Sequence, residues 1–401
     1  MGLAPQATAP AESSSAEMRR VSILGSTGSV GKSTVDLLQG HRDKYTVAAL
    51  TAHRNVDLLA QQARSLGAEL AVIGDASLYN ALKAALSGSG IEAAAGDDAI
   101  VEAAAFDSDW IMAAIVGAAG IRSTLKAIEA GRTVALANKE SLVCAGPFMM
   151  QAVEKSGATL LPVDSEHNAV FQVFDNAERQ GIRRIILTAS GGPFLRRTRA
   201  QLAGITPAEA VRHPTWAMGA KISVDSATMM NKSLEIIEAA YLFNLKNEQI
   251  DVLIHPQSVV HSMVEYVDGS ILAQMGAPDM RTPIAYTLGW PHRVKTTGDK
   301  LDLTKNINLS FEQIDIDRFY AVNLARQAFN AGLGYPSALN AANEVAVAAF
   351  LAGQLPFDAI EKVAEVALQS IEIPAISNLD DIFAVDAAAR AIATAAISAL
   401  K

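Results

Sequence analysis

Residues 20–38 read RVSILGSTGSVGKSTVDLL, an apolar run followed at once by a glycine-rich turn and a helical pattern. Gly25, Gly28 and Gly31 are spaced three residues apart in this turn. Such a turn lets the backbone approach a diphosphate, and the N-terminus of the next helix offers free N–H groups and a positive dipole end. The stretch therefore predicts the first strand, turn and helix of a dinucleotide-binding fold.

Two other interpretations of this turn stay open. The usual dinucleotide fingerprint has one residue between its first two glycines, whereas this turn has two. A P-loop for ATP differs from Ser26–Ser33 at one position, because Gly31, Lys32 and Ser33 match it but Ser26 replaces a glycine. The third interpretation is a tight connection between strand and helix without a ligand.

The end of the second predicted strand bears on the choice of nicotinamide cofactor. About 20 residues past the turn, an NAD-binding fold places an acidic residue on the ribose 2′-hydroxyl. Here the strand ends in Thr51, Ala52, His53, Arg54 and Asn55, with no acid and a cationic arginine. The sequence therefore favours a 2′-phosphate, and hence NADP.

Six short β-rich runs alternate with helix-like segments in the first 164 residues, which predicts a parallel sheet covered by helices. The runs begin at residues 21, 45, 70, 109, 133 and 159. Further strands are predicted from RRIILTAS at 183, DVLIHP at 251 and SMVEYVDGSILAQM at 262, around a helix that begins near Ser226. Beyond Phe311 the pattern is almost entirely helical.

These patterns predict an α/β chain with a Rossmann-like N-terminal domain, an α+β catalytic domain and a C-terminal helical bundle. The expected divisions are a flexible tail (1–18), an NADP-binding domain (19–163), a metal- and substrate-binding domain (164–290), a linker (291–310) and a helical domain (311–401).

The composition limits the classes of function. The chain has 401 residues, half of them hydrophobic, and a net charge of -9, which argues against an extended contact with nucleic acid. Its single cysteine, Cys144, excludes an internal disulfide, and we expect it to be a buried filler rather than a nucleophile. No uninterrupted apolar run reaches the roughly 20 residues that cross a bilayer. We expect a cytoplasmic enzyme with neither nucleic acid nor membrane as a partner.

Asp164 and Glu166 lie two residues apart at the end of a predicted strand, where alternate side chains share one face. Two carboxylates in this position repel each other unless a cation lies between them, and hard oxygen ligands select Mg²⁺ or Mn²⁺ over zinc. A solvated acidic loop is the alternative. His167 is either a further ligand or a structural histidine.

A second polar cluster, on the helix expected to begin near Ser226, supports a metal site. Asn231, Lys232 and Glu235 occupy positions i, i+1 and i+4 and lie on adjoining faces of one turn. Hydroxyl, amide and ammonium donors at the opening of a helix suit a phosphate. The alternatives are N-capping by Ser226 or Asp225 and a polar surface stripe.

Eight long and unusual segments carry a resemblance to a known family. They are LGSTGSVG from 24, AAIVGAAGI from 113, LANKESLV from 136, LPVDSEHNA from 161, ASGGPF from 189, HPTWAMGAKISVDSATMMNKSLE from 213, MGAPDMRTPIA from 275 and LNAANEVAVAAFL from 339. Together they resemble the 1-deoxy-D-xylulose 5-phosphate reductoisomerase family over essentially the whole chain after the tail. The resemblance implies a homodimeric enzyme that uses NADPH and Mn²⁺ or Mg²⁺ to rearrange and reduce this sugar phosphate for isoprenoid synthesis.

The resemblance also implies roles for individual residues. Asp164, Glu166 and Glu235 would hold the metal, and Lys139 would lie beside the reacting carbons. Trp216 falls on a loop at about 204–220 that resembles the family's lid. The remaining implied residues are Ser165, Ser190, His213, Ser226, Asn231 and Lys232 at the substrate, and Thr27, Gly28, Ser29, Val30, His53, Arg54, Asn55, Asn138, Glu140, Gly219 and Met280 at the cofactor.

The chain departs from the family pattern at two places. Ala189 stands where glycine is common, and His53-Arg54 replaces a Gly-Lys pair. Arginine keeps the cation but replaces a point charge by a planar fork. Two alternative functions are a metal-independent NADP dehydrogenase and a regulator that senses NADPH, and neither requires the metal and phosphate cluster.

Overall fold

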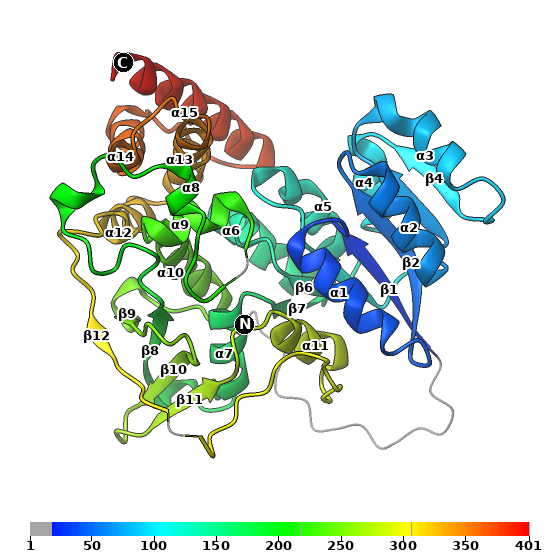
Figure 1. Cartoon of the computed structure of the whole chain (residues 1–401), viewed down its shortest axis with the longest axis horizontal. Helices are drawn as coiled ribbons and strands as arrows, with labels where there is room; N and C mark the ends of the chain where they lie inside the picture. The colour runs from blue at the N-terminus through cyan, green and yellow to red at the C-terminus, as the bar shows by residue number, and fades with distance from the viewer. Residues whose placement is uncertain (1–17, 217, 306, 401) are drawn as a thin grey trace.

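The computed structural model describes residues 18–216, 218–305 and 307–400, which form two sheets and a group of C-terminal helices (Figure 1). The predicted α/β fold class is confirmed. The predicted tail, 1–18, lies outside the described residues except for Met18.

The first sheet has seven parallel strands in the order β4-β3-β2-β1-β5-β6-β7. The order reverses between β1 and β5, and open α/β sheets bind ligands at such a point, beyond the carboxyl ends of the strands. The strands are β1 (Arg19–Leu24), β2 (Tyr45–Ala52), β3 (Leu70–Ile73), β4 (Glu92–Ala95), β5 (Trp110–Ala113), β6 (Thr133–Leu136) and β7 (Thr159–Pro162); the helices are α1 (Ser29–Gln39), α2 (Val56–Leu66), α3 (Tyr79–Ala85), α4 (Asp97–Ala103), α5 (Ile121–Glu129) and α6 (Lys139–Ser156).

Burial explains which strands were visible in the sequence. The central strands are covered on both faces, so β5 has no residue more than 1% exposed and reads as a continuous apolar run. The edge strand β4 was not predicted. Its sequence is EAAA, its residues are only partly buried, and alanine has a low preference for strands.

The glycine-rich turn forms the strand, turn and helix that the sequence predicts. Gly25 takes a φ of 90°, and a Cβ there would lie 2.7 Å from the Ala114 carbonyl oxygen. A Cβ on Gly31 would lie 2.3 Å from the Gly25 carbonyl oxygen and 2.6 Å from the Ser26 backbone. Glycine is therefore required because α1 packs directly on the turn, and Gly28 caps the helix.

The second sheet has five strands in the order β11-β10-β8-β9-β12, and only β8 and β9 run parallel. Helix α7 packs on β10 and β11, and α11 returns to the first sheet to pack on α1. The elements are α7 (Ser165–Val173), β8 (Ile182–Ala189), α8 (Pro207–Ala210), α9 (Ala220–Ala227), α10 (Met230–Leu242), β9 (Ile250–Ile254), β10 (Val260–Tyr266), β11 (Ile271–Met275), α11 (Arg281–Gly289) and β12 (Glu312–Gln313).

The helix predicted to begin near Ser226 is in fact two helices. Asp225 and Ser226 lie in the last turn of α9, so neither of them caps the next helix. Met229 then takes a φ of 63°, and α10 begins at Met230. The prediction was wrong because methionine rarely adopts the left-handed backbone conformation, and the residue type gives no sign that it does so here. Of the 13 residues of α10, 11 are buried.

The chain ends in α12 (Ala321–Ala331), α13 (Tyr335–Leu351), α14 (Ile360–Ser370) and α15 (Leu379–Ala399), which pack together and against α10 and α6. Among the described residues, α15 is the one helix long and apolar enough to cross a membrane, with a mean hydropathy of 1.5. It lies along α13 and α14 and carries Asp386 and Arg390, which break up its apolar residues.

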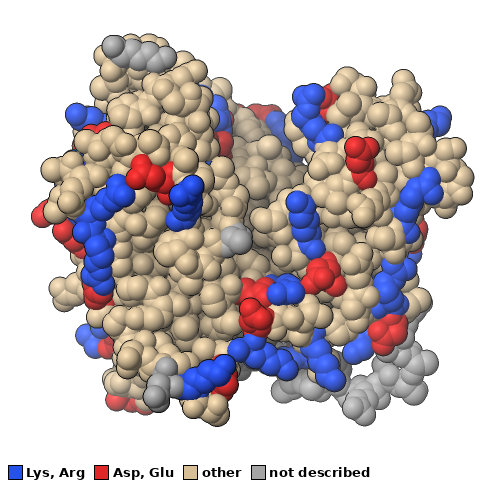
Figure 2. All heavy atoms as spheres, viewed as in Figure 1, with Lys and Arg blue, Asp and Glu red and all other residues tan. Residues whose placement is uncertain are grey.

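Charged side chains of both signs are intermixed on the face seen in Figure 2. Ion pairs between partly exposed side chains include Arg196 with Glu312 and Arg20 with Glu69. This face therefore has no continuous basic stripe of the kind that follows a nucleic acid backbone.

Replacing Gly31 tests the close packing of α1 on the turn. We expect Gly31→Ala to lower the free energy of unfolding by about 3 kcal/mol, because the added Cβ meets backbone that cannot move aside. Thermal unfolding of the purified variant measures this loss. Gly40→Ala is the matched control, since Gly40 has a φ of -76° and its nearest neighbour would lie 3.5 Å away. Equal midpoints for the two variants would contradict the packing.

Candidate active site

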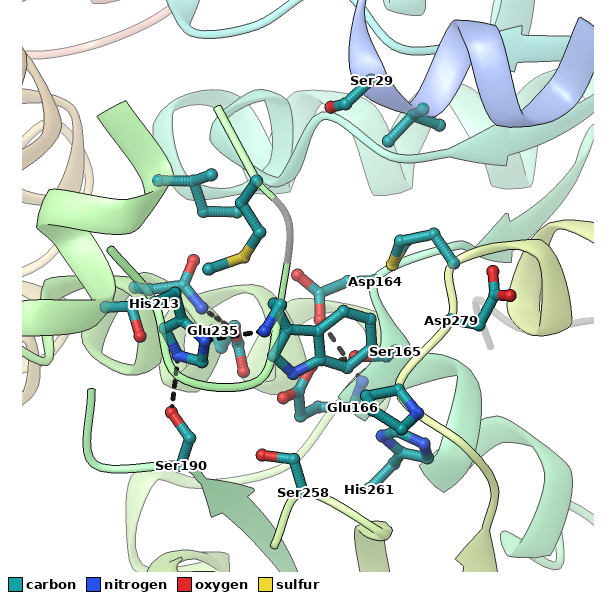
Figure 3. A pocket seen from close by; sticks show the side chains of 18 of the residues that line it. Ser29, Asp164, Ser165, Glu166, Ser190, His213, Glu235, Ser258, His261 and Asp279 are labelled. Atoms are coloured by element: carbon teal, nitrogen blue, oxygen red, sulfur yellow. Dashed lines mark hydrogen bonds between the residues drawn. The ribbon is translucent and has the colours of Figure 1, made fainter. Parts of the chain in front are cut away.

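A cavity of about 530 Å³ lies between the N-terminus of α1 and the second sheet (Figure 3). Three of the residues predicted at the cofactor line it, namely Ser29, Val30 and Met280. Every residue predicted at the metal or the substrate also lines it: Lys139, Asp164, Ser165, Glu166, Ser190, His213, Trp216, Ser226, Asn231, Lys232 and Glu235. The predicted cofactor residues outside its lining are Thr27, Gly28, His53, Arg54, Asn55, Asn138, Glu140 and Gly219.

Asp164, Glu166 and Glu235 come together as the sequence suggested, but from different elements. The expectation that Asp164 and Glu166 share one face of a strand was wrong, because β7 ends at Pro162. Asp164 instead caps α7 and accepts a hydrogen bond from the Glu166 N–H at 3.3 Å. Glu235 projects from α10, and one oxygen of each carboxylate lies within 4.8 Å of the others.

Two ammonium groups lie among these three carboxylates. Lys139 contacts Asp164 and lies 3.2 Å from Glu235. Lys232 contacts Glu235 and lies 3.2 Å from Glu166. Both lysines are almost fully buried, so cations already occupy the space between the carboxylates.

If all three carboxylates were ionised, their negative charge would exceed the positive charge of the two lysines. Burial and the neighbouring Glu235 carboxylate raise the pKa of Glu166 to about 8. Glu166 therefore keeps its proton at neutral pH. A further cation beside the three carboxylates would lower the pKa of Glu166 and favour the loss of that proton. The oxygen donors of the three side chains suit Mg²⁺ or Mn²⁺, so these residues fit the predicted metal.

His167 is a structural residue. Its ring is fully buried, its Nε2 lies 2.9 Å from the Glu235 carbonyl oxygen, and its Nδ1 lies 2.8 Å from a Glu238 carboxylate oxygen. Burial lowers the pKa of His167, but Glu238 outweighs burial and raises it to about 9. Both ring nitrogens are therefore engaged, and the pair ties α7 to α10 behind the carboxylates.

The other end of the cavity is built from neutral donors. His213 Nδ1 accepts the Trp216 N–H at 2.9 Å, and its Nε2 lies 2.9 Å from the Ser190 hydroxyl (Figure 3). Burial lowers the pKa of His213 to about 4, so the ring is neutral at pH 7. Because Nδ1 is the acceptor, Nε2 carries the proton. Ser226 and Asn231 also line the cavity, and Asn231 links this part of it to the carboxylates by accepting a hydrogen bond of 2.9 Å from Lys139 and donating one to Glu235.

Two glycines bring the end of β8 to this position. Gly191 and Gly192 have φ values of 81° and 67°, which suit glycine. A Cβ on Gly192 would lie 2.7 Å from the Ser226 carbonyl oxygen. The turn therefore does more than reverse the chain, since it places Ser190 beside α9.

Four residues that line the cavity were not predicted to do so: Ser258, His261, Asp279 and Arg281. The Trp216 ring lies 6.0 Å from that of His261, and Ser258 has a φ of 49° beside them. Burial lowers the pKa of His261 to about 4. Asp279 and Arg281, joined by a 2.6 Å ion pair, line the end near α1. No spacing in the sequence marks these residues, because the fold brings them from β10 and the start of α11.

The nucleotide end has features that a cofactor would complete. No side chain caps α1, so N–H groups of its first turn remain free for an anion. Asn138 donates to the Gly117 carbonyl oxygen at 3.1 Å, while its own Oδ1 is buried and has no hydrogen-bond partner among the described residues. These groups fit a dinucleotide diphosphate and a polar cofactor group.

Arg54 is positioned by an acid that the sequence analysis missed. Its guanidinium lies 3.1 Å from Asp75, at the end of β3, and 70% of the side chain is exposed. His53 lies against Gly74, where a Cβ would meet its Nδ1 at 2.9 Å. Asn55 caps α2 by accepting the Leu58 N–H at 3.1 Å. A cation and an acid therefore stand together where the adenosine ribose is expected.

A nucleotide-binding sheet beside a metal and phosphate site defines an oxidoreductase that depends on NADP and a divalent metal. Family models agree. Residues 21–146 match the model described as 1-deoxy-D-xylulose 5-phosphate reductoisomerase, and residues 160–243 and 275–392 match two models of its C-terminal domains. The chain belongs to the 1-deoxy-D-xylulose 5-phosphate reductoisomerase family.

Individual relatives agree over nearly their whole length. The reductoisomerase of Zymomonas mobilis subsp. mobilis is 56% identical over 382 residues, covering 95% of this chain and 98% of the relative. That of Rhodospirillum centenum is 58% identical and covers 95% of each chain. A structure of the Zymomonas mobilis enzyme with NADPH has a TM-score of 0.90 at 54% identity, covering 96% of this chain and 99% of that one. A reductoisomerase structure with NADPH, fosmidomycin and magnesium has a TM-score of 0.91 at 43% identity, with the same coverage.

The raised pKa of Glu166 predicts how metal binding depends on pH. Glu166 holds its proton below about pH 8, and a metal ligand must lose it, so Mg²⁺ affinity rises by about tenfold per pH unit up to that pH. Calorimetry in buffers of different ionisation enthalpy measures the affinity and the proton released.

Two variants accompany this titration. Glu235→Gln removes a proposed ligand and abolishes binding. Glu361→Gln is the control, because burial also raises the pKa of Glu361, to about 7, but it lies on α14 and does not line the cavity. An affinity that does not change between pH 6 and 8 would rule out a proton on Glu166.

Proposed function

We propose that this chain converts 1-deoxy-D-xylulose 5-phosphate into 2-C-methyl-D-erythritol 4-phosphate, using NADPH and a divalent metal, in the non-mevalonate route to isoprenoids. The substrate rearranges to a branched aldehyde, which is then reduced. The observation that carries the proposal is one cavity that joins three clustered carboxylates, a set of phosphate donors and the N-terminus of α1. NADPH, and not ATP, is the nucleotide at α1.

Asp164, Glu166 and Glu235 hold Mg²⁺ or Mn²⁺. When bound, the metal supplies a Lewis acid to the substrate's carbonyl and hydroxyl oxygens, and NADPH supplies the hydride. Lys139 acts as a fixed positive charge beside the reacting carbons. Burial lowers the pKa of its ammonium, but Asp164 and Glu235 outweigh burial and hold that pKa well above its usual value, so Lys139 does not serve as a base.

The neutral end of the cavity binds the substrate phosphate. Ser190, Ser226 and Asn231 supply hydroxyl and amide donors, and neutral His213 donates from Nε2. Lys232 adds a positive charge, since nearby carboxylates outweigh burial and raise the pKa of its ammonium. Ser165 contacts the substrate beside Glu166. Holding the phosphate at a distance from the reacting carbons lets its binding energy orient them.

The segment at 204–220 closes over this cavity as a lid. Trp216 and Met218 are its lining residues, and Gly219 begins α9 behind them. Closure excludes water and strengthens the electrostatic interactions inside the site.

We assign the binding of the cofactor to residues 19–163 and that of metal and substrate to 164–290, with 291–310 as linker and 311–401 as a supporting helical domain. The cofactor residues are those predicted: Thr27, Gly28, Ser29, Val30, His53, Arg54, Asn55, Asn138, Glu140, Gly219 and Met280. Arg54 faces the 2′-phosphate. Either Mg²⁺ or Mn²⁺ serves as the metal, fosmidomycin occupies the substrate end of the cavity, and the enzyme works in the cytoplasm.

The active form is a homodimer that pairs through β11. This strand is an edge of the second sheet, and Ile271 and Leu272 are about half exposed, with Val267 exposed beside them. An exposed apolar edge strand can pair with another chain through the backbone N–H and C=O groups of its outer side. In a dimer with two-fold symmetry, the two copies of the strand pair with each other.

A coupled assay tests the reaction. NADPH absorbance should fall only when 1-deoxy-D-xylulose 5-phosphate and Mg²⁺ or Mn²⁺ are both present, and a chelator should stop it. Glu235→Gln should reduce turnover by about 1000-fold, the order of the Lewis-acid contribution. Turnover that survives chelation would identify a metal-independent dehydrogenase. A folded protein that binds NADPH without consuming it would identify a regulator.

Light scattering tests the oligomeric state. The particle should have twice the 42.2 kDa mass of the chain. Leu272→Lys should shift the population to monomer, because a charge at the paired edge is buried in the dimer. Leu303→Lys is the control, since Leu303 is 61% exposed and lies outside the second sheet. A wild-type monomer, or a dimer that Leu272→Lys leaves intact, would contradict pairing through β11.

A further inference from the structure

Lys221 lies outside the cavity and joins α6 to α9, the helix that follows the proposed lid. It is the second residue of α9, two residues after the N-cap Gly219. Its Nζ lies 2.8 Å from a Glu140 carboxylate oxygen on α6 and 2.9 Å from an Asp225 carboxylate oxygen on α9 itself. Lys221 does not line the cavity, so it has no direct contact to offer a substrate.

The contacts of Lys221 are buried and continue into the C-terminal helices. The Glu140 and Asp225 side chains are less than 10% exposed. The second oxygen of Asp225 accepts a hydrogen bond of 2.8 Å from the Asn343 amide on α13. One ammonium thus joins α6 to α9, and α9 is fixed to α13.

The two ends of this connection lie near the proposed sites of two different ligands, the cofactor and the substrate. On one side, Glu140 stands in the first turn of α6, directly after Asn138, which donates to the Gly117 carbonyl oxygen, and Lys139, which contacts Asp164. On the other side, α9 begins at the end of the lid and carries Ser226 into the phosphate end of the cavity. Lys221 therefore connects the chain at the end of the proposed lid to the first turn of α6.

We infer that Lys221 is a positioning residue that couples closure of the lid over the substrate to binding of the cofactor. This inference rests on the proposed function, because it concerns the same two ligands. When the lid is closed, the ion pair holds Glu140 and the first turn of α6 in one position. Without the Lys221 cation, the cofactor orders only the α6 side of this connection and the substrate orders only the α9 side. Binding of one ligand then no longer changes the affinity for the other, and by linkage this loss is the same for both ligands.

The test is the affinity for NADPH with and without fosmidomycin, measured by calorimetry on the Mg²⁺-loaded full chain. In the wild type, saturating fosmidomycin should tighten NADPH binding by about tenfold, within the usual range of coupling. In Lys221→Met this factor should fall to within twofold of one. Lys221→Arg keeps the cation and should restore most of the coupling.

Two further variants keep the outcome clear. Lys221→Met leaves two buried carboxylates without a counter-charge and can unfold the chain; Lys221→Gln retains an amide donor and should show the same loss in a folded protein. Arg184→Met is the matched control, because Arg184 joins Glu265 to Asp251 on the second sheet in the way that Lys221 joins its two partners. It should lower the melting temperature and keep the coupling.

The results separate this inference from the proposed function. A wild type that binds neither NADPH nor fosmidomycin contradicts the function itself. A wild type that binds both without coupling, folded Lys221 variants that retain the tenfold factor, or an equal loss in Arg184→Met would each overturn the role of Lys221.

Discussion

The Lys139 ammonium lies between carboxylates from two other helices, and the centre of the molecule depends on it. Lys139 belongs to α6. Asp164, at the start of α7, and Glu235, within α10, both lie against its ammonium group. An unpaired charge in such a buried place costs several kcal/mol, so the cation stabilises the three-helix junction as well as the site. In the proposed function, a divalent metal at the carboxylates would enter a junction that these side chains already hold together.

The same turn of α6 serves three parts of the molecule through three successive side chains. Asn138 faces the loop after β5, Lys139 faces the carboxylates, and Glu140 faces α9. Neighbouring residues at the start of a helix point in different directions, so one turn contacts the loop after β5, the carboxylates and α9 at once.

The sequence was sufficient for features that depend on local pattern. The strand, glycine turn and helix at residues 20–38 required only glycine spacing and periodicity, and the carboxylates required only their chemistry and the family resemblance. It was insufficient where distant segments meet. Asp75 reaches Arg54 from the next strand, and His261 reaches Trp216 across the cavity, through contacts that no spacing encodes. The left-handed Met229 shows the second limit, since packing imposed a backbone that its side chain does not favour.

The burial of α10 has a consequence for how the protein can change over evolutionary time. Eleven of its thirteen residues are enclosed by α6, α12 and the second sheet, so almost any replacement there disturbs close packing as well as chemistry. An inhibitor that fills the cavity would therefore select few substitutions on α10, because the fold tolerates few of them. Escape would have to arise at residues that line the cavity outside this helix, such as Trp216 and Met218, which are only partly buried.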